Sequence, residues 1–375
     1  MKPDVDGSST ELTLFLCGDV MTGRGVDQIL PHPCPPRLYE PLVRSALDYI
    51  ALAERAYGAI PRAVDHAYVW GVALEELEQR RPHVRIVNLE TSVTTCEDAE
   101  PKGINYRMHP ANVGVLTAAR VDCATLANNH ILDWGRAGLC DTLDTLAKAS
   151  VHTAGAGRTL DEAEAPAILD VAGGGRVLVF AAAGPDCGVP SDWAAGTDEP
   201  GVFRLHDYSP KAVDRIAGLV TAEKRAGDVA VASIHWGANW GFDVPAEHRR
   251  FAHQLIERAR IDVVHGHSSH HAKGIEVHRG RPIFYGCGDF LNDYEGIHGP
   301  KDYRDDLTLM YFPSLDARTG NLMSLEMVPL RIRNFQLHHP SAAECAWLRD
   351  TMARECRRFG HNVAAPDHAL RLEWD

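Results

Sequence analysis

Apolar runs that stop at polar side chains recur along this chain, and they predict the strands of a sheet. In the segment 11–17 polar and apolar residues alternate at first, and the rest is fully apolar up to Gly18 and Asp19. This pattern is typical of a central strand. Similar runs predict further strands at 84–90, 121–127, 228–234, 261–264, 282–289, 307–312 and 322–332, and a hairpin over 167–171 and 176–183. These runs predict a core built on extended strands.

Segments with helical spacing lie between many of these runs. Apolar residues recur every three or four positions within 38–80, and again at 110–120, 135–149, 209–226, 245–260 and 341–359. Strands that alternate with helices are typical of an α/β protein. Because no repeat or domain boundary is visible, we expect a single domain over residues 1–375, with a C-terminal extension from about residue 335.

Two stretches predict irregular structure. The proline-rich segment 31–37 cannot form a regular element, because prolines lack the backbone donor, and we interpret it as a surface excursion near a site. Residues 184–201 are rich in Gly, Pro and Asp and predict a long loop.

Composition narrows the class of protein. The chain has 375 residues, 45% of them hydrophobic, but no apolar run long enough to span a membrane, and its start lacks the pattern of a secretory signal. Nine cysteines without a Cys-x-x-Cys pair are expected to be reduced thiols. The net charge of −13 disfavours nucleic acid and anionic membranes as partners. We therefore expect a cytoplasmic protein, and its oligomeric state stays open.

Chelating side chains gather at the ends of the predicted strands. They are Asp19, Glu90, Asn129 with His130, His235, and His267 with His270. Carboxylate, imidazole and amide groups are the ligand types of a centre with one or two divalent metal ions, and α/β enzymes place their chemistry at strand ends. Each residue alone can be explained without a metal, as a helix cap, a core imidazole or a surface group. Their recurrence at five strand ends favours a metal centre.

Several motifs in the same order resemble one family. They are Gly18-Asp19-Val20-Met21-Thr22-Gly23-Arg24, Asn88-Leu89-Glu90, Asn128-Asn129-His130 with Asp133 and Gly135, His235-Trp236-Gly237, Gly266-His267-Ser268-Ser269-His270 and Gly288-Asp289-Phe290. Together they resemble the CapA-like, poly-γ-glutamate capsule biosynthesis family, a branch of the calcineurin-like metallophosphatase superfamily. The resemblance covers residues from about 12 to about 294.

The resemblance implies a fold and a site. The fold would be a four-layer αββα sandwich of calcineurin-like metallophosphoesterase type, with metals at the carboxyl ends of the strands. The implied ligands are Asp19, Asn129, His235, His267 and His270, with Glu90 in place of the bridging carboxylate, His130 as general acid and Asp133 orienting its ring. The ions would be one or two of Mn, Fe, Zn, Ca or Mg.

Two departures from the superfamily pattern affect the implied ligand set. The Asp-x-His start is Asp19-Val20-Met21 here, so one imidazole is missing and the occupancy of one metal is open. The final Gly-His-x-His is Gly-His-x-x-His, which leaves open which of His267, Ser268, His270 and His271 bind metal.

The resemblance admits three functions. Stand-alone members include enzymes that epimerise the C-terminal residue of ribosomal lasso-peptide precursors, so we expect a metal-dependent Cα epimerase acting on a peptide. Its acid/base groups would come from His130, His271, Asp293 and Glu295. Arg24, Trp236 and Asp293 are expected to contact the substrate, within a set of nearby aromatic residues. The alternatives are a metallophosphoesterase and a protein that handles or binds a poly-γ-glutamate-type polymer without turnover.

Overall fold

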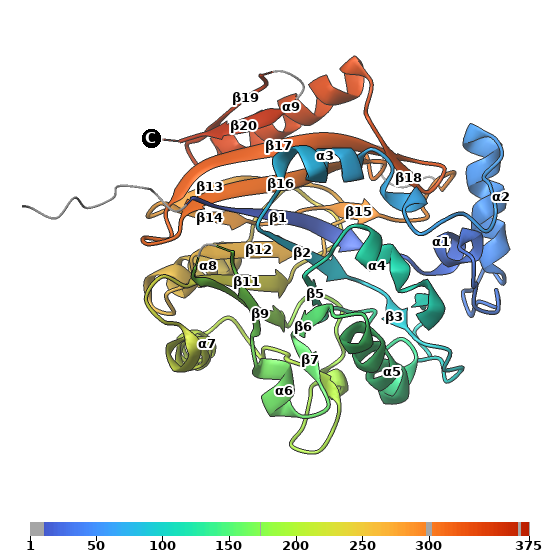
Figure 1. Cartoon of the computed structure of the whole chain (residues 1–375), viewed down its shortest axis with the longest axis horizontal. Coiled ribbons are helices and arrows are strands. Elements are labelled where there is room, and N and C mark those ends of the chain that lie inside the picture. The colour runs from blue at the N-terminus through green and yellow to red at the C-terminus, as the bar shows by residue number, and fades with distance from the viewer. Residues whose placement is uncertain (1–10, 173, 298–301, 367–368, 375) are drawn as a thin grey trace, which may run out of the picture.

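The structure, a computed structural model, describes residues 11–172, 174–297, 302–366 and 369–374. Two β-sheets face each other at the centre, and helices lie against their outer sides (Figure 1). This arrangement confirms the prediction of an α/β fold.

The larger sheet has ten strands and mixes parallel and antiparallel pairs. Its main path runs in the order β19-β20-β17-β16-β1-β2-β5-β6, with β15 beside β1 and β18 beside β17. The strands are β1 (Glu11–Val20), β2 (Val84–Leu89), β5 (Cys123–Thr125), β6 (His152–Ala154), β15 (Asp289–Leu291), β16 (Leu307–Asp316), β17 (Leu322–Arg333), β18 (Gln336–His338), β19 (Asn362–Ala364) and β20 (Leu370–Glu373).

The smaller sheet has six strands in the order β13-β14-β12-β11-β9-β8. They are β8 (Ala167–Asp170), β9 (Arg176–Ala183), β11 (Val229–His235), β12 (Val263–His267), β13 (Ile275–His278) and β14 (Arg281–Phe284). Two short ribbons pair β3 (Ser92–Val93) with β4 (Arg107–Met108), and β7 (Ala156–Gly157) with β10 (Gly201–Val202). In Figure 1 the arrowheads of β1, β2, β11 and β12 point toward the same end of the molecule.

The two-residue period of β11 divides its side chains between two hydrophobic clusters. Val229 and Val231 pack in the cluster between the sheets, whereas Ala230 and Ile234 pack against the helices on the outer side. Ser233 and His235 follow the period of Val229 and Val231. The strand therefore delivers its polar side chains into the space between the sheets.

The helices match most of the predicted segments. They are α1 (Arg24–Ile29), α2 (Ala46–Tyr57), α3 (Ala73–Arg80), α4 (Gly114–Ala118), α5 (Gly135–Lys148), α6 (Leu160–Glu164), α7 (Pro210–Glu223), α8 (Ala246–Glu257) and α9 (Ala342–Arg357), with short 3₁₀ turns at Tyr68–Trp70, Pro110–Asn112 and Ser191–Trp193. The prediction for 110–120 is only partly right, because a 3₁₀ turn precedes α4 there. None of the helices in the described ranges is long and apolar enough to cross a membrane.

The predicted strand over 282–289 is wrong as one element. The chain leaves the small sheet after Phe284 and enters the large sheet at Asp289, where β15 pairs with β1. Gly288, between them, has a φ of +80°, a conformation that favours glycine. Residues 281–291 therefore supply one strand to each sheet.

The segment beyond about residue 335 joins the large sheet. Strand β18 pairs with β17, and β17 pairs in turn with β20. Leu348 of α9 belongs to the same hydrophobic cluster as β1. All nine cysteines lie in the described part of the chain and are free, as predicted.

Candidate metal centre

Strand register brings the predicted ligands to one place. In the small sheet His235 lies beside His267, and in the large sheet Asp19 lies beside both Asn88 and Asp289. The ends of parallel strands meet at one edge of a sheet, and here the two sheets bring two such edges together. Candidate ligand atoms of Asp19, His235 and His267 all lie within 4.8 Å of one another.

The imidazoles of this cluster are held in fixed orientations. The Nδ1 atoms of His235 and His267 lie 2.8 Å apart, and His235 Nε2 lies 3.0 Å from Asn129 Oδ1. His267 Nε2 lies 2.8 Å from the Ser233 hydroxyl, which also contacts His265 at 3.1 Å. Such partners fix the ring orientation of metal-binding histidines.

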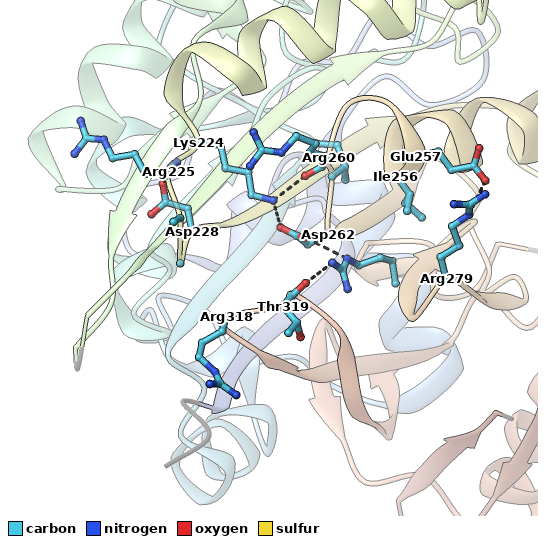
Figure 2. A pocket seen from close by; sticks show the side chains of 15 residues that line it. Lys224, Arg225, Asp228, Ile256, Glu257, Arg260, Asp262, Arg279, Arg318 and Thr319 are labelled. Atoms are coloured by element: carbon cyan, nitrogen blue, oxygen red, sulfur yellow. Dashed lines mark hydrogen bonds and ion pairs between the residues drawn. The ribbon is translucent and has the colours of Figure 1, made fainter. Parts of the chain in front are cut away.

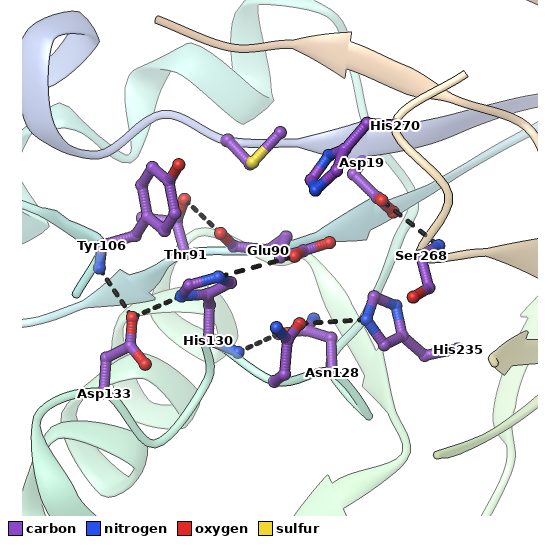
Figure 3. A network of polar contacts seen from close by, with 12 residues as sticks. Asp19, Glu90, Thr91, Tyr106, Asn128, His130, Asp133, His235, Ser268 and His270 are labelled. Carbon is purple, nitrogen blue, oxygen red and sulfur yellow. Dashed lines mark hydrogen bonds and ion pairs between the residues drawn. The ribbon is translucent and has the colours of Figure 1, made fainter. Parts of the chain in front are cut away.

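Buried carboxyl groups complete the cluster. Asn88 Nδ2 donates to Asp19 Oδ1 at 2.7 Å and to Glu90 Oε2 at 3.3 Å, while the Ser268 amide donates to the other Asp19 oxygen at 3.2 Å. His270 Nδ1 lies 2.8 Å from Asp289 Oδ1. Figure 3 shows Asp19, Glu90, His235 and His270 converging from separate strands and loops.

The protonation preferences of these groups suit a cation. Burial, and then the charge of Asp289, raise the pKa of Asp19 to about 7, and burial together with the Asp19 and Asp289 charges raises the pKa of Glu90. Burial lowers the pKa of both His235 and His267, which keeps their rings neutral. Neutral imidazoles beside crowded carboxylates are the donor set that a divalent metal ion takes. The residues present therefore fit the predicted one or two ions.

A second polar group, His130 with Asp133, borders the cluster. His130 Nδ1 lies 2.7 Å from Asp133 Oδ2, and its Nε2 lies 3.8 Å from Glu90 Oε1. The Tyr106 amide donates to Asp133 Oδ2 at 2.6 Å, and Lys102 Nζ donates to Oδ1 at 2.7 Å. Figure 3 shows the Asp133 carboxylate between the Tyr106 amide and the His130 ring. Burial lowers the pKa of His130 to about 4.

Three residues of this region were absent from the predicted site. Asp289 holds His270, and its position after Gly288 repeats the Gly18-Asp19 pattern, so the motif contained a signal. Asn88 was also part of a quoted motif, Asn88-Leu89-Glu90, but only Glu90 was predicted to be a ligand. Lys102 comes from an irregular loop, and no local pattern marks it.

Two predicted substrate contacts bind each other. Arg24 Nε donates to Asp293 Oδ2 at 3.1 Å, and its Nη1 donates to Glu40 Oε1 and Tyr49 Oη, each at 2.9 Å. The Arg24 and Asp293 side chains are only 2% and 1% exposed. Both are therefore engaged in a buried ion pair, which favours a structural role.

Three other predicted site residues also have contacts of their own. Both Glu295 oxygens accept backbone hydrogen bonds, from Asn334 at 2.7 Å and Phe335 at 2.6 Å. Trp236 lies in the cluster on the helix side of the small sheet and stacks on His248 at 4.9 Å. His271 packs against the ring of Tyr303, with ring centroids 4.5 Å apart. These contacts argue against proton transfer by Glu295 and against substrate contact by Trp236.

The family model for the bacterial capsule synthesis protein PGA_cap matches residues 13–294, which carry all of the cluster. The chain belongs to this family.

A probable polyglutamine synthesis accessory protein of Mycobacterium tuberculosis is 48% identical over 369 residues, covering 98% of this chain and 97% of that protein. The PGA biosynthesis protein CapA of Bacillus subtilis is 28% identical over 208 residues, covering 55% and 52%. The capsule biosynthesis protein CapA of Bacillus anthracis is 22% identical over 327 residues, covering 86% and 68%. The CapA-like family predicted from the motifs is confirmed.

The cluster predicts that this family member binds metal through Asp19. Replacement of Asp19 by Asn removes a buried charge at nearly constant volume, so bound metal, measured by inductively coupled plasma mass spectrometry, should fall to less than half of the wild-type content. Because metal binding to the native state stabilises it, a chelator should lower the Tm of the wild type but not of Asp19→Asn. The exposed Asp48→Asn is the control. Equal metal content in all three proteins would contradict the site.

The buried pair predicts a large stability effect for Arg24. Arg24→Ala leaves the Asp293 and Glu40 carboxylates without their guanidinium partner, and should lower the free energy of unfolding in urea by about 3–5 kcal/mol. Arg62→Ala, which breaks the largely exposed pair with Glu54, should cost less than about 1 kcal/mol. If Arg24→Ala keeps full stability and loses only substrate affinity, the role expected from the sequence is correct instead.

Proposed function

We propose that this protein is a metal-dependent hydrolase that cleaves a peptide-type bond in a glutamyl polymer. The observation that carries the proposal is the His130–Asp133 pair beside a cluster of buried metal-ligand types. The polymer is inferred from relatives that are named for polyglutamine and PGA synthesis. On this proposal the two stacked sheets with outer helices are the αββα sandwich of calcineurin-like metallophosphoesterases.

The chemistry divides between the cluster and His130. Divalent ions held by Asp19, Glu90, Asn129, His235, His267, His270 and Asp289 would polarise the scissile carbonyl and lower the pKa of the attacking water. His130 Nδ1–H donates a hydrogen bond to the Asp133 carboxylate, which leaves the unprotonated Nε2 facing the cluster. In that tautomer His130 takes a proton from water and returns it to the leaving amine.

Asp133 acts as a positioning residue. It is fully buried, and the Tyr106 amide and Lys102 fix both of its oxygens. The Tyr106 and His130 rings also pack edge to face, with ring centroids 4.5 Å apart. These contacts hold the imidazole in one orientation before substrate binds.

The Cα epimerase expected from the sequence needs two bases on opposite faces of the reacting carbon. Of its four candidates, Asp293 is paired with Arg24 and Glu295 is bound to backbone amides. His271 lies within an aromatic group that includes Trp240 and Tyr303. One proton-transfer group at the cluster supports hydrolysis better than epimerisation.

The proton-transfer role predicts the behaviour of His130→Ala. The variant should keep its bound metal, because the ring contacts Glu90 only at 3.8 Å, yet turnover should fall by about 10²–10⁴-fold. Turnover should fall less in Asp133→Asn, and its pH profile should change, since the substitution removes the negative charge beside the His130 ring and replaces one accepting oxygen by a donor. Activity near the wild-type level in His130→Ala, with metal retained, would remove His130 from the mechanism.

The reaction class can be read from one experiment in D₂O. Metal-loaded protein incubated with a defined oligoglutamate should give shorter chains, each cleavage adding one water, and a chelator should stop it. Deuterium gain at a single Cα without shortening would instead support the epimerase. Phosphate release from an aryl phosphate, with the oligoglutamate unchanged, would support the phosphoesterase alternative.

A further inference from the structure

A hollow of about 520 Å³ lies at the end of the small sheet opposite the metal cluster. Its wall includes Asp228 and Asp262, the residues directly before β11 and β12. His235 and His267, at the metal cluster, are the last residues of the same two strands. The turns between β13 and β14 and between β16 and β17 close it on the other side. Figure 2 shows this hollow from close by.

Basic side chains dominate the lining. It contains six basic residues, Lys224, Arg225, Arg260, Arg279, Arg281 and Arg318, and three acidic ones, Asp228, Glu257 and Asp262. Asp228 is bound at 2.6 Å by Arg176, which lies outside the lining, so it neutralises little of this charge. One carboxylate, Asp262, serves both Lys224 and Arg281. The hollow is therefore positive in a protein whose net charge is −13.

Three of the arginines are exposed and weakly engaged. Arg225 interacts with Asp228 through its amide and its charge, and Arg318 lies 3.9 Å from Asp316. Within the described residues, the Arg260 side chain has no ion-pair partner. Clustered cations in an acidic protein raise the local concentration of anions. A cluster of this sign in an acidic protein points to an anionic ligand.

We propose that this hollow, named here the arginine hollow, binds carboxylates of the glutamyl polymer at a distance from the metal centre. The identity of the polymer rests on the proposed function. The arginine hollow would hold one part of a long chain while another part lies at the metal centre. It is a binding site and takes no part in bond cleavage.

The layout of the charges favours a chain over a compact anion. In Figure 2 Arg225 and Arg318 extend to different sides of the central Lys224–Asp262 pair, so their guanidinium groups are spread along the surface. Guanidinium groups bind carboxylates in a two-pronged geometry, and repeated carboxylates along a chain can engage several of them. The lining has no aromatic side chain on which a nucleic-acid base could stack.

The separation of the two sites sets a minimum chain length. Strand β11 spans the distance from Val229 to His235, which is roughly 20 Å at about 3.3 Å per residue. An extended peptide therefore needs at least about six residues to reach from the arginine hollow to the metal cluster. Shorter oligomers can occupy one site at a time.

The test is binding of a fluorescein-labelled long oligoglutamate to the full chain, followed by fluorescence anisotropy with chelator present. The double variant Arg225→Glu/Arg318→Glu should weaken binding by on the order of tenfold and reduce its salt dependence. The control Arg44→Glu/Arg55→Glu changes the net charge equally at exposed positions and should bind like the wild type. Thermal unfolding checks that all three proteins are folded.

The possible outcomes separate this inference from the proposed function. Arginine-dependent binding that persists with chelator supports the arginine hollow, even if no cleavage is seen. Binding that is lost on chelation or in Asp19→Asn, but is equal in both double variants, overturns the arginine hollow and leaves the hydrolase standing. No binding, or equal loss in both double variants, also overturns it. Tighter, arginine-dependent binding of a polyphosphate or an oligonucleotide overturns the assignment to a glutamyl chain.

Discussion

Burial of several carboxyl groups at one point constrains the rest of this structure. Asp19, Glu90 and Asp289 are each at most 2% exposed, and burial, followed by the charge of neighbouring carboxylates, raises the pKa of Asp19 and Glu90. Buried charges are costly unless a partner of opposite sign is present. A divalent cation at the cluster would offset this unfavourable charge, and the neutral rings of His235 and His267 would add ligands without adding repulsion.

The two-sheet architecture places these groups at the ends of neighbouring strands. Each strand needs only to end where its neighbour ends, and the period of two then turns alternate side chains toward the opposite sheet. Ser233 donates to Thr125 across the gap at 3.2 Å, and His265 Nε2 lies 2.7 Å from the Cys17 carbonyl. Polar contacts between the sheets thus lead directly into the cluster.

The sequence predicted what depends on local pattern and missed what depends on distant partners. Strand ends with chelating residues were visible because the apolar runs stop there, so Asp19, His235 and His267 could be named. Trp236, expected as a substrate contact, is buried on the helix side of the small sheet, because a residue next to His235 on an extended chain points the other way. The role of Glu295 depends on amides some 40 residues later, and only the fold brings them together. The break after Phe284 was missed, although Gly286 and Gly288 follow it and glycine weakens a strand.

The passage of the chain from β14 to β15 has a consequence for folding. The few residues after Phe284 tie the two sheets together covalently beside the cluster, and β15 then pairs with β1 from the other end of the matched region. Contacts so distant in sequence form late, because the loop must close before they can contribute. The carboxylates of Asp19 and Asp289 therefore meet only when β15 has paired with β1 in the large sheet. An ion that needs both carboxylates could therefore be captured only after the two ends of the matched region have come together.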